Sequence, residues 1–163
     1  PFWGNLRAKE EIIMKAVVQR VSHAHVDIDG VTVGAIEKGF LVLLGVWSGD
    51  SEEDCRQLAE KVGNLRVFED ENGKLNKALA DVQGAVLVVP NFTIAGDCRK
   101  GNRPSFIKAE RPERAVPLFE LFKQTLAERG IPVQSGVFGA DMQVSLVNDG
   151  PITLIVEKGD NSF

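Results

Sequence analysis

The run Phe40-Leu41-Val42-Leu43-Leu44 is apolar without interruption and is bounded by Gly39 and Gly45. A strand with one face in water alternates apolar and polar residues, whereas an unbroken run is typical of a strand covered on both faces. We therefore predict a central strand over residues 40–46. Even when it is extended to Trp47, the run is much shorter than the roughly 18 apolar residues of a membrane-spanning helix. We accordingly expect a soluble protein that does not enter a membrane.

Strand signals also precede this run. Residues 15–21 alternate apolar and polar side chains, and Asp29-Gly30 separates two β-branched runs, residues 25–28 and 31–33. Because Asp-Gly readily adopts the positive φ angles of a two-residue turn, we predict a β-hairpin at this point.

Two amphipathic helices are indicated further along the chain. The first is predicted to begin after Ser51, a good N-cap, and to end at Gly63. The second is predicted from Pro112, which the first turn of a helix tolerates, to Gly130. Short strands are predicted over residues 65–68, 85–89, 133–138, 142–147 and 152–156, with a loop over 95–104. This order of elements indicates an α+β fold with antiparallel or mixed β-sheets.

Length and composition indicate one domain. The chain has 163 residues, of which 44% are hydrophobic and 26% charged, and this suffices for a single core. We predict that residues 14–157 form this domain and that residues 158–163 are a polar tail. Residues 1–13 differ in pattern, and Lys9-Glu10-Glu11 can be encoded by a purine-rich ribosome-binding sequence. We interpret them as an upstream extension, and a genuine N-terminal arm is the alternative.

Side chains suited to metal binding or nucleophilic catalysis are few. Cys55 and Cys98 are not paired in a CxxC motif, which fits a reducing, cytoplasmic compartment. His23 and His25 share one face of a predicted strand, and two imidazoles alone make a poor metal site. No GxSxG elbow, Walker glycine loop or HExxH motif occurs, and tyrosine is absent. We expect neither a metal nor a cofactor.

Residues 99–114 are basic in a protein whose net charge is −4. Six basic residues face two acidic ones in this segment, which gives it a net charge of +4. A solvated mobile loop, a phosphate-binding loop and a contact with the acidic helix of a partner subunit are all compatible with this composition.

Gly150-Pro151 lies between two predicted strands, so we predict a hairpin-like tip there. Proline donates no N–H group and glycine has no side chain, so such a tip presents bare carbonyl groups to whatever it meets.

Several motifs in order resemble the D-aminoacyl-tRNA deacylases, also called D-tyrosyl-tRNA deacylases, of bacterial type. The resemblance runs from Met14 to about Val156. It is carried by the segments at residues 14–21, 65–74 and 100–106, and by residues 140–153, which contain the NxGPxT motif of that family.

The resemblance implies a barrel-like core with flanking helices and a homodimer in which each subunit lends its Gly150-Pro151, held cis, to the site of the other. An L side chain would clash with this carbonyl wall, whereas the hydrogen of a D residue or of glycine fits. The tRNA substrate would place its terminal adenosine in a pocket, and no membrane is involved.

Site residues follow from the same resemblance. Asn91, Phe92 and Thr93 correspond to the catalytic segment, with main-chain N–H groups as oxyanion donors and the Thr93 hydroxyl as an orienting group or nucleophile. The chiral filter and its surroundings comprise Gly150, Pro151, Asn148, Thr153, Arg20 and Met142. The tRNA contacts are expected from Arg99, Lys100 and Arg103.

Two positions depart from the family pattern. Pro90 stands where the family has Ser, and Asn91 where it has Gln, so the contacts of the usual pair must change. A related animal branch with relaxed chiral specificity also carries Pro here. Two alternatives to a D-aminoacyl-tRNA deacylase therefore stay open. One is a catalytically weak tRNA- or DNA-binding paralogue with altered selectivity, and the other is a hydrolase of small D-amino-acid esters.

Overall fold

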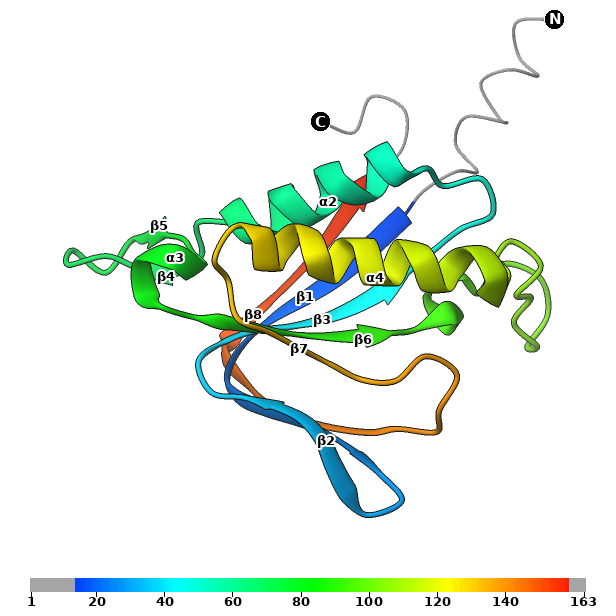
Figure 1. The fold of residues 1–163 in the computed structure, drawn as a ribbon, viewed down its shortest axis with the longest axis horizontal. Coiled ribbons are helices and arrows are strands. Elements are labelled where there is room, and N and C mark those ends of the chain that lie inside the picture. The colour runs from blue at the N-terminus through cyan, green and yellow to red at the C-terminus, as the bar shows by residue number, and fades with distance from the viewer. Residues whose placement is uncertain (1–13, 159–163) are drawn as a thin grey trace, which may run out of the picture.

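Figure 1 shows a computed structural model of the chain, which describes residues 14–158. Its strands are β1 (Met14–Ile28), β2 (Val31–Ile36), β3 (Gly39–Gly45), β4 (Phe68–Glu69), β5 (Leu75–Lys77), β6 (Ala85–Pro90), β7 (Val133–Ser135) and β8 (Gln143–Lys158). Its helices are α2 (Glu52–Asn64), α3 (Leu79–Val82) and α4 (Pro112–Glu128), with a 3-10 turn, η1 (Phe92–Ala95). Within residues 14–158, no helix is long and apolar enough to cross a membrane.

The main sheet is mixed and is organised around β1. On one side β1 pairs antiparallel with β8, and on the other side it pairs antiparallel with β3 and then with β2. The parallel pairs β3·β6 and β6·β7 extend the sheet. Strand β2 also contacts β6 and β7, so the sheet curls into a nearly closed barrel (Figure 1). The predicted α+β class with a mixed sheet and a barrel-like core is confirmed.

The two faces of the sheet carry separate cores. One face packs against α2 and α4, which lie side by side across it (Figure 1), and buries Phe40, Leu58 and Phe122 completely. The other face fills the barrel around Val26, Leu41 and Leu87. Strand β3 contributes to both cores, because Phe40 and Leu41 point to opposite faces. This confirms the prediction of a central strand covered on both sides.

The predicted hairpin and the predicted starts of both long helices are confirmed. Asp29 and Gly30 have φ angles of 49° and 79° and join β1 to β2 in the predicted hairpin. Ser51 caps α2 by accepting a hydrogen bond from the Asp54 N–H group at 3.1 Å, and Pro112 begins α4.

Other elements differ from the prediction. Residues 143–158 form the single strand β8, where two strands joined by a hairpin-like tip were predicted, and both halves of β8 run antiparallel to β1. The strand expected over residues 65–68 is reduced to Phe68–Glu69, which pairs with β5 in a separate ribbon. Leu65 and Val67 pack against the helix-side core instead of joining the ladder. The predictions for residues 1–13, and for most of the polar tail, lie outside the described residues.

Candidate active site

The end of β6 delivers the segment that was predicted to be catalytic. Pro90 pairs with Leu44 at the last rung of the β3·β6 ladder, and the Asn91 N–H group donates to the Leu44 carbonyl at 2.9 Å. The chain then turns into η1, which begins at Phe92. The first N–H groups of a helical turn have no intrahelical acceptor, so those of Phe92 and Thr93 are suited to bind an anion. The Thr93 hydroxyl donates to Asn91 Oδ1 at 2.5 Å, so Asn91 orients it.

A mainly apolar cavity of about 330 Å³ opens beside this segment. Its lining comes from three distant parts of the chain: Pro90, Phe92, Ala109, Glu110, Pro112, Phe138 and Gly139. Phe92 is 57% exposed, an unusual fraction for a phenylalanine, and it forms part of this wall. Apart from Pro90 and Phe92, sequence reasoning did not find these residues, because nothing local marks Ala109 or Phe138 as neighbours of β6.

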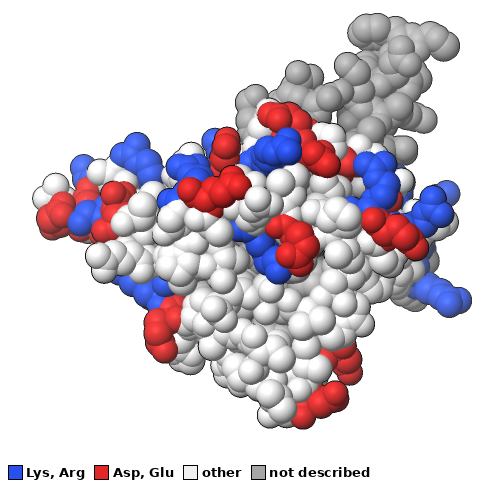
Figure 2. All heavy atoms as spheres, viewed as in Figure 1, with Lys and Arg blue, Asp and Glu red and all other residues white. Residues whose placement is uncertain are grey.

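The basic loop before α4 lies against the same site. An antiparallel bridge between Asp97 and Ser105 closes its base, with hydrogen bonds of 2.7 and 2.9 Å. Phe106 meets the Phe92 ring edge to face, with centroids 5.4 Å apart. The Arg99 guanidinium lies 2.7 Å from Asp97 Oδ2 and holds the pKa of that carboxyl well below its usual range. Lys and Arg atoms gather at the right-hand edge of Figure 2, where Figure 1 places this loop.

The Gly150-Pro151 segment is a bulge in β8, opposite Arg20. Gln19 pairs with Thr153 and Val21 with Asn148, so four residues of β8 oppose the single residue Arg20 of β1. The Gly150-Pro151 bond is cis, as the resemblance implied. The bulge replaces the predicted hairpin tip, because the strand continues along β1 in the same direction on both sides of it.

Polar contacts hold the bulge in shape. The buried Arg20 side chain donates from Nε to the Asp149 carbonyl at 3.0 Å and from a terminal nitrogen to the Val67 carbonyl at 2.8 Å. Asn148 Nδ2 donates to Thr153 Oγ1, and the Ile152 N–H group donates to Asn148 Oδ1, each at 2.8 Å. The residues of the NxGPxT motif therefore serve one local structure.

Gly150 is required by this backbone. Its φ angle is +135°, and a Cβ atom placed on it would lie 2.9 Å from the Ile152 nitrogen. An L residue would be strained there whatever the surrounding space.

The predicted site residues fall into two separate groups within one chain. Arg20 pairs with Phe40, which pairs with Val86, and Asn91 follows the end of β6, five residues after Val86. Five residues at about 3.3 Å give roughly 16 Å along the strands, and three strand spacings of about 4.8 Å give roughly 14 Å across the sheet. Along the surface of the sheet, the bulge and the β6 end are therefore on the order of 20 Å apart. Met142 belongs to the β6 group, because its sulfur packs on Gly136, whose N–H group bonds to Val88.

Cys55 and His25 lie apart from both groups. Cys55 is buried under α4 and donates to the Leu118 carbonyl at 3.1 Å, and burial raises its pKa to about 12. It is a core residue. His25 Nε2 lies 3.5 Å from Asp27 Oδ2 at the β1–β2 hairpin. In the part of the chain that the structure describes, no three His, Cys, Asp or Glu residues are grouped to hold a metal ion.

Burial also singles out Asp50, which sequence reasoning missed. Its side chain is fully buried in front of α2, where the Trp47 N–H group donates to Oδ2 at 2.7 Å. Within residues 14–158, Oδ1 has no hydrogen-bond partner. Desolvation raises the pKa of this carboxyl to about 7. Asp50 does not line the apolar cavity. We therefore expect it to affect the stability of the fold and not the reaction.

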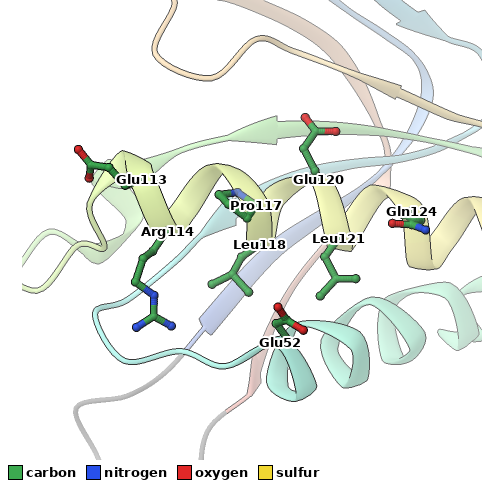
Figure 3. Close-up of a pocket in the computed structure, with 8 residues that line it drawn as sticks. All are labelled: Glu52, Glu113, Arg114, Pro117, Leu118, Glu120, Leu121 and Gln124. Atoms are coloured by element: carbon green, nitrogen blue, oxygen red, sulfur yellow. The ribbon is translucent and has the colours of Figure 1, made fainter.

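A second hollow of about 350 Å³ lies on the outer surface between α2 and α4. Figure 3 shows Glu52 reaching from α2 toward Leu118 and Leu121 of α4, while Glu113 and Glu120 point away. The lining residues do not include any predicted site residue, so this hollow is not the candidate active site.

The chain is similar to known proteins over nearly its whole length. A family model described as D-Tyr-tRNA(Tyr) deacylase matches residues 17–157. The D-aminoacyl-tRNA deacylase of Thermus aquaticus is 56% identical over 147 residues, which cover 90% of this chain and 97% of that protein. The D-aminoacyl-tRNA deacylase of Geotalea uraniireducens (strain Rf4) is 58% identical over 148 residues, with 91% and 96% covered.

Two solved structures extend the comparison. The c-Myc DNA Unwinding Element Binding Protein superposes with a TM-score of 0.82 at 41% identity, covering 86% of this chain and 96% of that one. A probable eukaryotic D-amino acid tRNA deacylase superposes with a TM-score of 0.78 at 16% identity, covering 90% of this chain and 100% of that one. The second likeness shows the fold alone.

Proposed function

Since the chain belongs to the D-aminoacyl-tRNA deacylase family and so hydrolyses the ester bond of D-aminoacyl-tRNA, we propose that each of its sites is built by two copies. In this proposal, the Gly150-Pro151 bulge of one copy enters the site at the β6 end of the other. The observation that carries it is the separation, on the order of 20 Å, between these two groups within one chain. A bulge that far from its own β6 segment can act on a bound substrate only in a second molecule.

Strand β8 supports the dimer. Among residues 14–158 it pairs with β1 alone, so its outer edge is open to another protein surface. Its outward-facing apolar residues Val147 and Ile155 are 46% and 64% exposed. Exposed apolar side chains along a long edge strand are typical of an interface between subunits. A symmetric pair of such strands would also carry both bulges across the interface.

Chirality is then read by exclusion. The bulge presents main-chain carbonyl groups on a backbone that Arg20 and Asn148 hold in place. The substituent of an L residue on the α-carbon would collide with this wall, whereas the hydrogen of a D residue fits. Glycine has hydrogen at both positions, so we expect glycyl-tRNA to be hydrolysed as well. Because no side-chain pocket takes part, one site can serve many D residues.

The apolar cavity beside Phe92 suits the terminal adenosine of the tRNA. A volume of about 330 Å³ with walls from Phe92 and Phe138 matches a flat nucleobase, which binds well against aromatic rings. The basic loop that packs on Phe92 through Phe106 would hold acceptor-stem phosphates with Arg99, Lys100 and Arg103. Substrate affinity therefore comes from the RNA and not from the amino acid.

Little side-chain chemistry is then required. A water molecule attacks the ester carbonyl, and the negative charge that develops on its oxygen is stabilised by the N–H groups of Phe92 and Thr93. The bond between the carbonyl carbon and the ribose oxygen breaks, which releases the free D-amino acid and the tRNA. The adjacent ribose hydroxyl is placed to relay the proton from water to the leaving oxygen. Asn91, although shorter than glutamine, still reaches and orients the Thr93 hydroxyl.

A mixed dimer tests the exchange of bulges between subunits. Ala109→Trp would fill the adenosine cavity of its own chain, and Pro151→Ala would relax the filter that its chain supplies. A purified heterodimer of these two variants has one open cavity, on the Pro151→Ala chain. If the bulge crosses the interface, that cavity faces an intact filter, and the heterodimer hydrolyses D-aminoacyl-tRNA and spares L-aminoacyl-tRNA. Hydrolysis of L-aminoacyl-tRNA by the heterodimer would show that each chain filters for itself.

Assays of the unaltered protein separate the alternatives. A catalytically weak binding paralogue would leave D-aminoacyl-, glycyl- and L-aminoacyl-tRNA intact while retaining tRNA. A hydrolase of small esters would cleave D-amino-acid methyl esters as fast as D-aminoacyl-tRNA. We expect rapid cleavage of the D-aminoacyl- and glycyl-tRNA esters and negligible cleavage of the methyl esters.

A further inference from the structure

Ile107 is an exposed apolar residue on a turn that backbone hydrogen bonds hold in place. It is 90% exposed, more than any other large apolar residue among residues 14–158. The Ala109 N–H group donates to the Phe106 carbonyl at 3.1 Å and closes a turn that has Ile107 at its corner. A hydrogen bond of 2.8 Å from the Ser48 N–H group to the Lys108 carbonyl ties this turn to the domain. The loop therefore presents Ile107 outward instead of folding over it.

The position of Ile107 relates it to the apolar cavity. Ala109, which lines the cavity, is two residues away, so the two Cα atoms are at most about 7.6 Å apart. Phe106, the residue before Ile107, packs on Phe92 of the cavity wall. Ile107 thus stands at the rim of the cavity that we assign to the terminal adenosine.

The charges around Ile107 indicate what covers it. Lys100 and Arg103 are exposed in the same loop, and Lys108 and Arg111 follow within four residues. Cations around one apolar side chain match a nucleotide chain, whose phosphates bind the cations while the face of a base packs on the apolar group.

Resting on the proposed function, we propose that Ile107 is a specificity-determining contact for the base of the nucleotide that precedes the terminal adenosine in the tRNA acceptor end. The chain of that nucleotide leaves the cavity over its rim, its base lies on Ile107, and its phosphate lies toward Lys100 and Arg103. Ile107 thereby distinguishes an extended RNA 3′ end from a single aminoacyl nucleoside.

Two substrates test this assignment with purified full-length protein. On D-aminoacyl-tRNA, Ile107→Ala is expected to raise KM about three- to tenfold with kcat unchanged, and Ile107→Phe is expected to restore KM. On the D-aminoacyl ester of adenosine, which has no preceding nucleotide, all three proteins should have the same kcat/KM. The matched control is Val31→Ala. Val31 is β-branched and exposed, as Ile107 is, with an exposed fraction of 64%, but it lies in the β1–β2 hairpin.

Other outcomes overturn the inference. An equal loss on both substrates would mean that Ile107 shapes the cavity itself, and an unchanged KM on tRNA would mean that no base rests on it. A shift of Ile107→Ala from dimer to monomer in sedimentation would make the residue a subunit contact. If the unaltered protein hydrolyses neither substrate, the proposed function fails, and the inference fails with it.

Discussion

Asn148 Nδ2 donates a 2.8 Å hydrogen bond to Thr153 Oγ1, and this contact joins the two ends of the bulge that contains Gly150-Pro151. The two residues also pair with neighbouring positions of β1, Val21 and Gln19. The bulge is therefore closed at its base by side chains and anchored to the sheet by main chain. Its shape is fixed before any substrate arrives, which a filter working by exclusion requires.

The hydrogen bonds that Asn148 makes across the bulge act as a clamp, and their removal should reduce the selectivity of the enzyme. Asn148→Ala deletes the bonds to Thr153 and to the Ile152 N–H group, each contributing about 1 kcal/mol. We expect the ratio of D- to L-aminoacyl-tRNA hydrolysis to fall about tenfold, with a smaller change in the rate on the D substrate. Single-turnover hydrolysis of both substrates measures this. Asn72→Ala, in the exposed turn before β5, is the control, and an unchanged ratio in Asn148→Ala would contradict the clamp.

Gly150→Ala should destabilise the fold as well as the filter. The added Cβ would lie 2.9 Å from the Ile152 nitrogen at a φ angle of +135°, so the backbone must shift at a cost of about 1–3 kcal/mol. Thermal denaturation measures the effect. Gly101→Ala is the matched control, because Gly101 also has a positive φ of +62° but has nothing within 4 Å of its added Cβ. Equal losses in the two variants would rule out the clash at Gly150.

Pro151→Ala and Thr93→Ala should affect different properties of the enzyme. If the N–H groups at the start of η1 supply the oxyanion stabilisation, loss of the Thr93 hydroxyl removes only an orienting hydrogen bond of about 1 kcal/mol and slows hydrolysis of D-aminoacyl-tRNA only about tenfold. Loss of the Pro151 ring leaves that rate largely intact and increases hydrolysis of L-aminoacyl-tRNA by a larger factor. Rates of both variants on both substrates decide the matter. If Thr93→Ala slowed hydrolysis of D-aminoacyl-tRNA by a larger factor than Pro151→Ala increased hydrolysis of L-aminoacyl-tRNA, Thr93 would be favoured as a nucleophile.

The buried Asp50 predicts a pH-dependent stability. Desolvation raises its pKa from 3.8 to about 7, so the folded state binds a proton more tightly than the unfolded chain does between these values. This contribution to the free energy of unfolding is fully present below about pH 4 and is lost as pH rises through about 7. At about 1.4 kcal/mol per pKa unit, the total loss is at most about 4.5 kcal/mol.

Asp50→Asn should remove much of this dependence. Its amide can still accept the hydrogen bond from the Trp47 N–H group and never ionises. Urea denaturation at pH 5 and pH 8 should therefore show a smaller loss of stability in the variant than in the unaltered protein. Parallel pH profiles for the two proteins would show that Asp50 is not the titrating group.

The basic loop predicts a salt-dependent affinity for tRNA. If each of these cations neutralises one phosphate as proposed, replacement of both Arg99 and Lys100 by Ala should weaken binding and lower the slope of log Kd against log salt by up to about two. Filter binding at several salt concentrations measures this slope. Lys74→Ala, in the exposed turn between β4 and β5, is the control. An unchanged slope in the double variant would mean that the loop is a solvated surface that does not bind tRNA phosphates.

Elements with a strong local cause could be predicted from the sequence. The central strand follows from an apolar run without alternation, the hairpin from Asp29-Gly30, and the start of α2 from Ser51, which in the structure accepts the Asp54 N–H group. The Gly150-Pro151 bulge could not be distinguished from a turn, because both use residues that interrupt a strand. Only the pairing of β1 with both halves of β8 decides between them.

The candidate site was predictable only in part, for a similar reason. Asn91, Phe92 and Thr93 are contiguous and belong to a recognisable motif. The cavity beside them is completed by Ala109 and Phe138, which approach only because β6 and β7 are neighbours and the basic loop folds back. Arg20 looks like a surface residue of an alternating strand. Its burial becomes intelligible only when the carbonyl groups of Val67 and Asp149 are found around it.

The central position of β1 also affects how the protein is made. Met14, at one end of β1, pairs with Lys158 of β8. The first strand of the domain to be synthesised can therefore complete its pairing only after the last strand has left the ribosome. Until then one edge of β1 exposes unpaired N–H and C=O groups, and closing so long a loop slows folding. A nascent chain stalled before β8 should therefore be the form most prone to aggregation and most dependent on chaperones.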